Sequence, residues 1–328
     1  MPTFRTELPP LDFGFRIGHE DMLLSIGSCF TEHIGNRLKD LKFNDLLNPF
    51  GIVYNPISIS NQLHYLLSDR MISEKDLFWH NEQWHSFAHH SSFSGTDKVE
   101  TLAKMNASLM RARTQLEKTN RMMLTLGSSN VFIYKQTGEI VANCHKLPGQ
   151  EFERKRLHIR DIVEALEPNL RAIKKRNPDL QVIFTVSPVR HLRDGFIQNQ
   201  RSKAALVIAS QHLSEDLDYV HYFPSYEIMM DELRDYRFYD VDMIHPNQIA
   251  IDYIWERFGA AFFEEETTQL NAQIDAILKA AHHRPFNPES QSHQGFLGKQ
   301  LERIEALEKA HPNLDFTTER EIFLSQLI

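Results

Sequence analysis

Short apolar runs alternate with longer amphipathic segments along the chain. Runs that are apolar almost throughout and end near glycine or proline are typical of strands buried on both faces of a sheet. Such runs lie at 21–26, 121–126, 181–186 and 219–223. Between them, apolar residues recur at helical spacing, which predicts amphipathic helices. The expected helices span 30–40, 97–120, 159–175, 198–216, 225–234 and 247–263, and another begins at Asn55.

Buried strands that alternate with helices indicate a parallel sheet covered on both faces. The expected fold class is therefore α/β, with a three-layer, doubly wound, flavodoxin-like and mostly parallel sheet in one domain over residues 1–263. Two further segments, 77–93 and 131–142, carry turn residues between aromatic or apolar runs and are expected to form hairpins.

The chain changes character from residue 264 onward. The pattern there predicts a polar helix over 264–281, a loop over 285–299, and short helices over 299–311 and 318–327. We expect residues 264–328 to form a helical C-terminal extension that packs on the core.

The composition is that of an ordinary globular protein, with 41% hydrophobic and 24% charged residues among 328. A net charge of −8 argues against nucleic acid as a partner, because phosphate binding needs a basic face. No apolar run approaches the ~20 residues that span a bilayer, and the first residues lack the layout of a signal peptide. Two cysteines cannot form a disulfide framework. We therefore expect a cytoplasmic protein without a membrane partner.

Candidate chemistry gathers at one edge of the predicted sheet. Ligands of open α/β sheets bind beyond the carboxyl ends of the strands. The residues that follow the predicted strands, or precede the last core helix, are small, nucleophilic or ionisable. They are Gly27-Ser28-Cys29-Phe30, Gly127-Ser128-Ser129-Asn130, residues 187–191 and residues 242–247.

Ser28 is the candidate nucleophile, because it directly follows the first strand and begins a helix whose free N–H groups suit a developing oxyanion. Taken alone, such a serine is more often just a helix N-cap. Asp242 and His245 change this interpretation, since a histidine can remove the serine proton and a carboxylate can orient the histidine. An isolated Asp-x-x-His is more often a turn-capping aspartate followed by an ordinary surface histidine. The candidate catalytic residues are Ser28, Asp242 and His245.

This combination of a serine after the first strand and Asp-x-x-His before the last core helix resembles the SGNH or GDSL hydrolase superfamily. A closer resemblance is to the GSCFA family, named after a Gly-Ser-Cys-Phe-Ala motif, which Gly27-Ser28-Cys29-Phe30 matches with Thr31 in place of alanine. The resemblance covers about residues 20–260. Further stretches similar to that family lie at 48–56, 143–146, 187–191, 199–205 and 222–227.

The resemblance implies an SGNH-hydrolase-like fold and an oxyanion hole. The backbone N–H groups of Ser28 and Gly51 would form it together with an asparagine side chain. The superfamily asparagine belongs to a Gly-x-Asn-Asp motif, and here Asn130 lies one place late with no aspartate after it. We expect Asn143, which lies in a dense polar cluster, to supply the amide, with Asn130 as the alternative. The aspartate that usually precedes the nucleophile is also absent, and Gly27 stands in its place.

Other residues near this edge compete for chemical roles. Cys29 follows Ser28, but it points about 100° away around the helix and is expected to pack beneath the site. We expect His145, Arg190 and His191 to border the cleft and contact substrate. A solvent-exposed helix face is the simpler interpretation for Arg201 and Lys203. Of the 17 histidines, four lie close together in the 77–93 segment: His80, His85, His89 and His90.

This histidine group lacks the tight ligand spacing of a zinc site and fits an aromatic hairpin beside a cleft better. We expect no metal and no organic cofactor. The expected function is a serine ester hydrolase that removes O-acyl or O-acetyl groups from a carbohydrate or related small ester through an acyl-enzyme. The alternatives are an acyltransferase with the same site and a binding protein with a degenerate hydrolase site.

Overall fold

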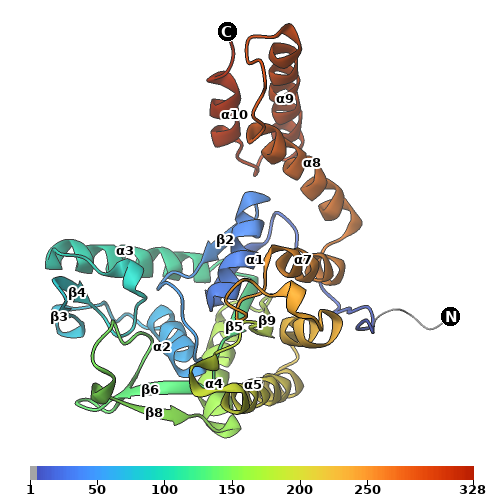
Figure 1. Cartoon of the computed structure of the whole chain (residues 1–328). Coiled ribbons are helices and arrows are strands. Elements are labelled where there is room, and N and C mark those ends of the chain that lie inside the picture. Colours follow the sequence, from blue (N-terminus) through green and yellow to red (C-terminus); the bar gives the residue numbers. More distant parts are fainter. Residues whose placement is uncertain (1–5) are drawn as a thin grey trace.

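A computed structural model of the chain describes residues 6–328, apart from the side chain of Asp194. Five parallel strands form the central sheet in the order β10-β9-β5-β1-β2 (Figure 1). Counted along the chain, this is the 2-1-3-4-5 order of flavodoxin-like sheets, so the predicted α/β class is confirmed. The strands are β1 (Met22–Gly27), β2 (Asn44–Leu47), β5 (Arg121–Leu126), β9 (Gln181–Val186) and β10 (Val220–Phe223).

Helices cover both faces of the sheet and make three layers. Alternate residues of each strand face opposite sides, so Leu24 joins one apolar cluster and Leu23 the other. The first cluster is covered by α2 (Pro56–Leu67), α3 (Lys98–Leu116), α4 (Ile159–Arg176) and α5 (Phe196–Asp216). The second is covered by α1 (Cys29–Asp40), α7 (Gln248–Phe262) and the π-helix over Ile228–Glu232, which continues the short α6 (Ser225–Glu227).

Smaller elements surround the carboxyl edge of the sheet. The predicted hairpins are present as β3 (Phe78–His80) with β4 (Gln83–His85), and β6 (Asn130–Tyr134) with β7 (Glu139–Val141). Strand β8 (Phe152–Arg156), which the sequence pattern did not indicate, pairs with β6. Short 3₁₀ turns lie at Glu74–Asp76, Ser91–Phe93, Gly149–Glu151, Leu192–Asp194 and Tyr236–Phe238.

Two elements differ from the sequence-based expectation for clear physical reasons. Strand β2 was missed because it contains a polar Asn-Asp pair. Asp45 is nonetheless buried there and accepts a hydrogen bond from Ser25 Oγ at 2.8 Å. Helix α9 (Gln291–Ala310) begins inside the segment expected to be a loop. It starts there because the Ser290 side chain accepts a bond from the His293 N–H, and Leu297 buries its side chain.

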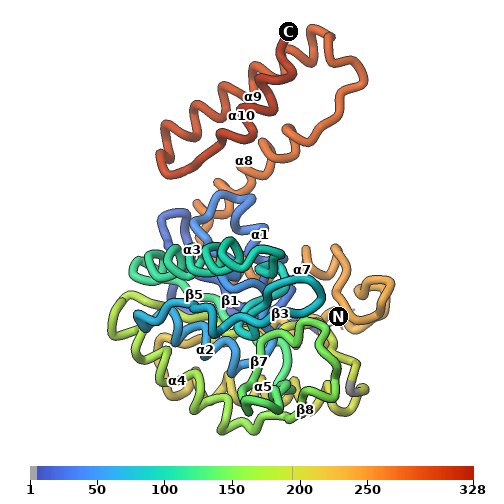
Figure 2. The backbone as a smooth tube through the Cα atoms, turned by 90° about the vertical axis from the view of Figure 1, so that its left-hand side faces the viewer, coloured from blue at the N-terminus to red at the C-terminus, as the bar shows by residue number. Residues whose placement is uncertain are grey.

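The three C-terminal helices, α8 (Glu265–Ala281), α9 and α10 (Thr317–Leu324), extend from the α/β core (Figures 1 and 2). They bury an apolar cluster of their own. Polar bonds join them to the core: Lys42 Nζ bonds both carboxylate oxygens of Glu319 at 2.8 and 2.9 Å, and Asn313 Nδ2 donates to the His19 carbonyl at 3.1 Å. The domain boundary near residue 264 stays a prediction. Within residues 6–328, no helix is long and apolar enough to cross a membrane.

Candidate active site

Ser28 lies between β1 and α1, at the carboxyl end of the sheet. Its extended backbone (φ −73°, ψ 179°) makes it the N-cap residue of α1, yet its side chain forms no capping hydrogen bond. The side chain is fully buried, and Oγ has no hydrogen-bond partner of any kind. A purely structural cap would bond its hydroxyl to the first turn of the helix. The capping interpretation therefore does not account for this hydroxyl.

Steric crowding explains why residue 27, directly before Ser28, is a glycine. A Cβ atom at Gly27 would lie 2.5 Å from both the Thr125 carbonyl oxygen and Thr31 Oγ1. The Gly27 N–H donates to Asn48 Oδ1 at 2.9 Å, which fixes the strand end against the next loop. No side chain fits at this position, so packing against β5 and Thr31 requires glycine here.

Asp242 and His245 form the pair that their spacing predicts. His245 Nδ1 lies 2.6 Å from Asp242 Oδ2. Asp242 Oδ1 accepts hydrogen bonds from the backbone N–H groups of Ile244 at 2.8 Å and His245 at 3.0 Å. The bonds from the His245 backbone and ring, with that from Ile244, lower the pKa of Asp242 to about 2. The Asp242 carboxylate is therefore ionised and orients the imidazole, leaving Nε2 as the ring nitrogen for a reacting proton.

The loop that carries this pair is attached to the sheet edge. The Arg190 N–H, just after β9, donates to the Ile244 carbonyl at 3.1 Å. Burial, with the charges of Lys203 and His245, lowers the pKa of His191 to about 3. Burial, Arg37 and His245 likewise lower the pKa of His33 on α1. His245 thus lies beside the residues that follow β9 and near the first turns of α1.

Ser28 and His245 are not hydrogen-bonded to each other, since Ser28 Oγ has no partner. The two differ in exposure as well: Ser28 is fully buried, whereas the His245 and Asp242 side chains are 44% and 43% exposed. The predicted triad is therefore present as a bonded pair on a loop and a separate hydroxyl at the strand end. An ester can reach Ser28 only after the side chains that cover it move.

Lys203 is the residue whose role the sequence interpretation missed. It was expected on an exposed helix face, and that expectation is wrong: Lys203 is fully buried, while Arg201 is exposed. Its Nζ donates to the carbonyl oxygens of Gly127 at 2.7 Å and Ser187 at 2.6 Å, just after β5 and β9. Burial lowers the pKa of Lys203 to about 7. A signal was available, because Lys203 lies one turn from Leu206 on the buried stripe of α5.

The two cysteines are free thiols. Burial raises the pKa of Cys29, and burial raises the pKa of Cys144 to about 11. Because the thiolate is the reactive form, both residues are poor nucleophiles near neutral pH. This favours Ser28 over its neighbour Cys29. Cys29 is partly exposed whereas Ser28 is fully buried, so the structure does not bear out the expectation that Cys29 packs beneath Ser28.

Two of the candidate oxyanion donors, Gly51 and Asn143, are already engaged in this structure. The Gly51 N–H donates to the Asn48 carbonyl at 2.7 Å inside a turn, where Gly51 has φ +78°. Asn143 Nδ2 lies 3.3 Å from Ser91 Oγ, and its Oδ1 accepts from the His145 N–H at 2.8 Å. Asn130, the alternative amide, is the first residue of β6. An oxyanion would have to compete with the bonds of Gly51 and Asn143, so their roles stay predictions.

The residues expected to contact substrate lie in different surroundings. His145 is buried, its Nε2 lies 2.8 Å from the Ser86 carbonyl oxygen, and burial lowers its pKa to about 4. The Arg190 guanidinium stacks over the Phe196 ring at 5.0 Å. His191 packs edge-on against Tyr54, with ring centroids 5.6 Å apart. His191 and Arg190 therefore border the His245 loop, whereas His145 belongs to the hairpin packing.

Three histidines of the hairpin region, His85, His89 and His90, form hydrogen bonds within it. His85 lies 2.6 Å from Ser94 Oγ and 3.0 Å from the His80 carbonyl, and its ring packs against His145 at 4.5 Å. Across residues 6–328, no three His, Cys, Asp or Glu side chains gather in a way that could hold a metal ion.

Comparison with known proteins gives two matches to family profiles. A profile described as the GSCFA family matches residues 22–258, and one described as the C-terminal domain of GSCFA domain proteins matches residues 274–328. No curated protein matches at a significant level. Among solved structures, an acetyl xylan esterase (Est2A) from the rumen bacterium Butyrivibrio proteoclasticus is similar, with a TM-score of 0.36 and 15% identity over 76% of this chain. The alignment spans 66% of that enzyme.

Proposed function

Because the chain belongs to the GSCFA family, we propose that it is a serine ester hydrolase that uses Ser28 as nucleophile, His245 as general base and Asp242 as the orienting carboxylate. One observation carries this proposal: Ser28 Oγ is buried without any hydrogen bond at the start of α1. A hydroxyl that neither caps the helix nor packs with a polar partner is available for chemistry. The bonded Asp242–His245 pair supplies the base that this hydroxyl needs.

The reaction proceeds through an acyl-enzyme. Ser28 Oγ attacks the ester carbonyl carbon while His245 Nε2 takes its proton. The ester C–O bond then breaks, and His245 gives the proton to the departing alcohol. Water attacks the acyl group while its proton passes to His245. The bond between the acyl carbon and Ser28 Oγ then breaks, His245 returns the proton to Oγ, and the carboxylic acid leaves. The Ser28 N–H stabilises the oxyanion, joined by that of Gly51 if its turn bond to Asn48 opens.

The substrate we propose is an O-acyl or O-acetyl ester of a carbohydrate or a related small molecule. Reaching it requires motion, since Ser28 is fully buried and His245 lies on a loop. The loop after Tyr236–Phe238 is the element that closes over the ester and brings His245 to Ser28. The Arg190–Ile244 backbone bond ties this loop to the segment after β9.

Labelling with a fluorophosphonate tests the nucleophile directly. We expect one label per chain on the tryptic peptide that contains Ser28, detected by mass spectrometry, because an activated serine reacts with this phosphorus electrophile. Cys29→Ala should be labelled like the wild type, and Ser28→Ala should not. Labelling at Cys29 would overturn the assignment. A folded protein that neither reacts nor hydrolyses esters would instead favour a binding protein with a degenerate site.

Asp242→Asn should lower kcat for acetyl esters by about 10²-fold with little change in KM. The amide orients His245 poorly and no longer balances the imidazolium. The loss is smaller than for a buried triad, because water reaches a pair that is more than two-fifths exposed. Since the pKa of Asp242 is about 2, the carboxylate stays ionised throughout the useful pH range, and changes in rate above pH 4 have another origin.

Asp240→Asn is the matched control for that variant. Asp240 lies on the same loop, and its Oδ1 accepts only the neighbouring Val241 N–H at 2.7 Å. In steady-state kinetics, kcat of the Asp240→Asn variant should stay within a factor of two of the wild-type value. Equal rates for Asp242→Asn and Asp240→Asn would remove Asp242 from the mechanism.

A further inference from the structure

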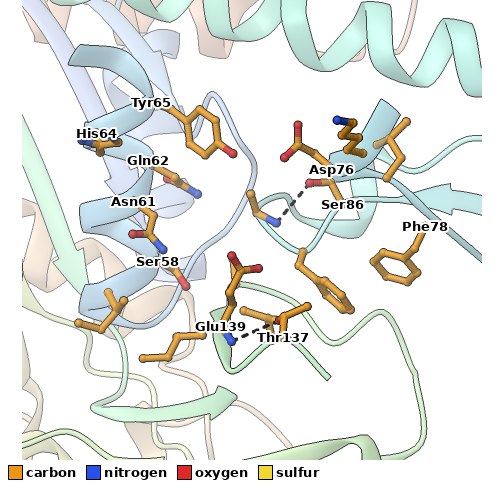
Figure 3. A pocket seen from close by; sticks show the side chains of 18 of the residues that line it. Ser58, Asn61, Gln62, His64, Tyr65, Asp76, Phe78, Ser86, Thr137 and Glu139 are labelled. Atoms are coloured by element: carbon orange, nitrogen blue, oxygen red, sulfur yellow. Dashed lines mark hydrogen bonds between the residues drawn. The ribbon is translucent and has the colours of Figure 1, made fainter. Parts of the chain in front are cut away.

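A cavity lies apart from Ser28 and the His245 loop, between α2, the segment around β3 and β4, and the β6–β7 turn (Figure 3). Its volume of about 600 Å³ falls within the ~300–1,000 Å³ range of small-molecule sites. None of the three proposed catalytic residues lines it. Helix α2, which forms one wall of the cavity, follows directly in the chain after the segment that carries Gly51 and Tyr54.

Gln62 is the unusual residue of this cavity. Its side chain is only 2% exposed, and neither Oε1 nor Nε2 has a hydrogen-bond partner. Figure 3 shows it pointing from α2 into the cavity. The other buried polar side chains of α2 are satisfied: Ser58 Oγ accepts from Asn55 Nδ2 at 2.9 Å, and Ser60 Oγ donates to the Ala165 carbonyl at 2.6 Å. A buried amide left unpaired is unfavourable, so Gln62 fits a ligand better than it fits the empty fold.

The remaining lining combines polar side chains with aromatic rings. Asn61 and Tyr65 on α2 face Ser86 and Glu139 across the cavity (Figure 3). On the β3–β4 side, the rings of Phe78 and Phe87 stack with centroids 4.2 Å apart. Amides and hydroxyls bond ring hydroxyls, and aromatic faces cover the C–H faces of a sugar ring.

The charges around the cavity balance one another. Arg70 and Asp76 form an ion pair at 2.5 Å, and the remaining pair, Lys75 and Glu139, carry opposite charges. A site for a phosphate or another anion would show an excess of cations, and a site for a cation would show the reverse. The lining therefore suits an uncharged ligand with many hydroxyl groups.

We infer that this cavity binds a neutral saccharide, with the Gln62 amide pairing two neighbouring hydroxyls and the Phe78–Phe87 pair covering a ring face. The idea that this cavity holds the sugar part of an esterified substrate rests on the proposed function. The idea that the cavity binds a saccharide does not depend on it. The Ala142 N–H donates to the Phe87 carbonyl at 2.8 Å, and Asn143 follows directly. The cavity wall thus continues into the predicted oxyanion region.

Binding of unesterified sugars tests the inference without any catalysis. Cellobiose, N,N′-diacetylchitobiose and mannobiose would be titrated into the wild type and Ser28→Ala by isothermal calorimetry. At least one should bind both proteins with equal Kd, and glucose 6-phosphate should bind no better than glucose. Gln62→Leu should weaken binding at least tenfold while its Tm stays equal or rises, because leucine removes the unpaired amide without opening a cavity.

Two further variants keep the test decisive. Gln211→Leu is the matched control, an exposed helical glutamine on α5 that bonds only Glu215, and it should bind sugars like the wild type. If Gln62→Leu does not fold, Glu139→Ala on the exposed β6–β7 turn decides, with a several-fold weaker Kd expected. Failure of every disaccharide to bind, or equal Kd values for wild type and pocket variants, would overturn the inference. Ester hydrolysis without sugar binding would leave the proposed function intact, and sugar binding without hydrolysis would leave the cavity assignment intact.

Discussion

Ser28→Ala is expected to lower kcat/KM for acetyl esters by about 10⁴-fold or more. The methyl group cannot attack the ester carbonyl, and the remaining groups supply only binding and partial charge stabilisation. The same substitution should leave the free energy of unfolding unchanged or raise it by up to about 1 kcal/mol, because it removes a buried hydroxyl that has no partner. Loss of activity together with retained or higher stability separates a reacting group from a structural one.

Thr31→Val is the control for this result. Thr31 Oγ1 is a second buried hydroxyl without a partner, one turn along α1, and it has no proposed chemical role. Its removal should change stability as little as Ser28→Ala does and should keep the rate within a few fold of the wild type. If the Ser28→Ala, Thr31→Val and Cys29→Ala variants all turn over acetyl esters at the wild-type rate, Ser28 is not the nucleophile.

Lys203→Ala should destabilise the protein by about 3–5 kcal/mol. It leaves the buried carbonyl oxygens of Gly127 and Ser187 without their shared donor and opens a cavity beneath the sheet edge. Lys203→Met fills most of that space, so it should destabilise by a smaller amount, about 2–3 kcal/mol, which isolates the hydrogen bonds. Urea unfolding followed by circular dichroism measures both differences.

The loss in Lys203→Met should also grow with pH. The pKa of Lys203 is about 7 in the folded protein and about 10.5 in an unfolded chain, so between these values the unfolded state binds more protons. Deprotonation of Lys203 therefore increases the free energy of unfolding of the wild type as pH rises from 7 to 10.5. Methionine does not titrate, so the variant shows no such increase. Lys118→Met, on the exposed surface, should show no such difference between pH 6.5 and pH 9. A pH-independent loss in Lys203→Met would contradict a neutral amine at this position.

The sequence pattern predicted those parts of the molecule that depend on local periodicity and short spacing. The order of buried strands and helices is enough for the flavodoxin-like sheet, since connections in such folds are constrained. The Asp242–His245 bond was predictable because three positions on a loop let the chain close on itself. The position of Ser28 after β1 followed from the same reasoning.

What the pattern could not supply was the pairing of polar groups across distant elements. An isolated lysine is usually exposed, and only tertiary contacts with two strand ends make a buried Lys203 tolerable. The Gly51 N–H was assigned to an oxyanion, whereas a backbone bond to Asn48 already uses it. No local pattern marks Gln62, because whether a buried amide finds a partner depends on the whole surrounding structure.

The separate apolar cluster of the C-terminal helices has a consequence for cooperativity. Helices α8, α9 and α10 hold their buried side chains among themselves, with Leu41 packed against them from the core. Elements that share little apolar surface with the rest need not melt together with it. A single two-state free energy would then blend two events, one for the sheet that carries Ser28 and one for the helices. Spectroscopic probes placed separately in the sheet domain and in the C-terminal helices would distinguish the two unfolding events.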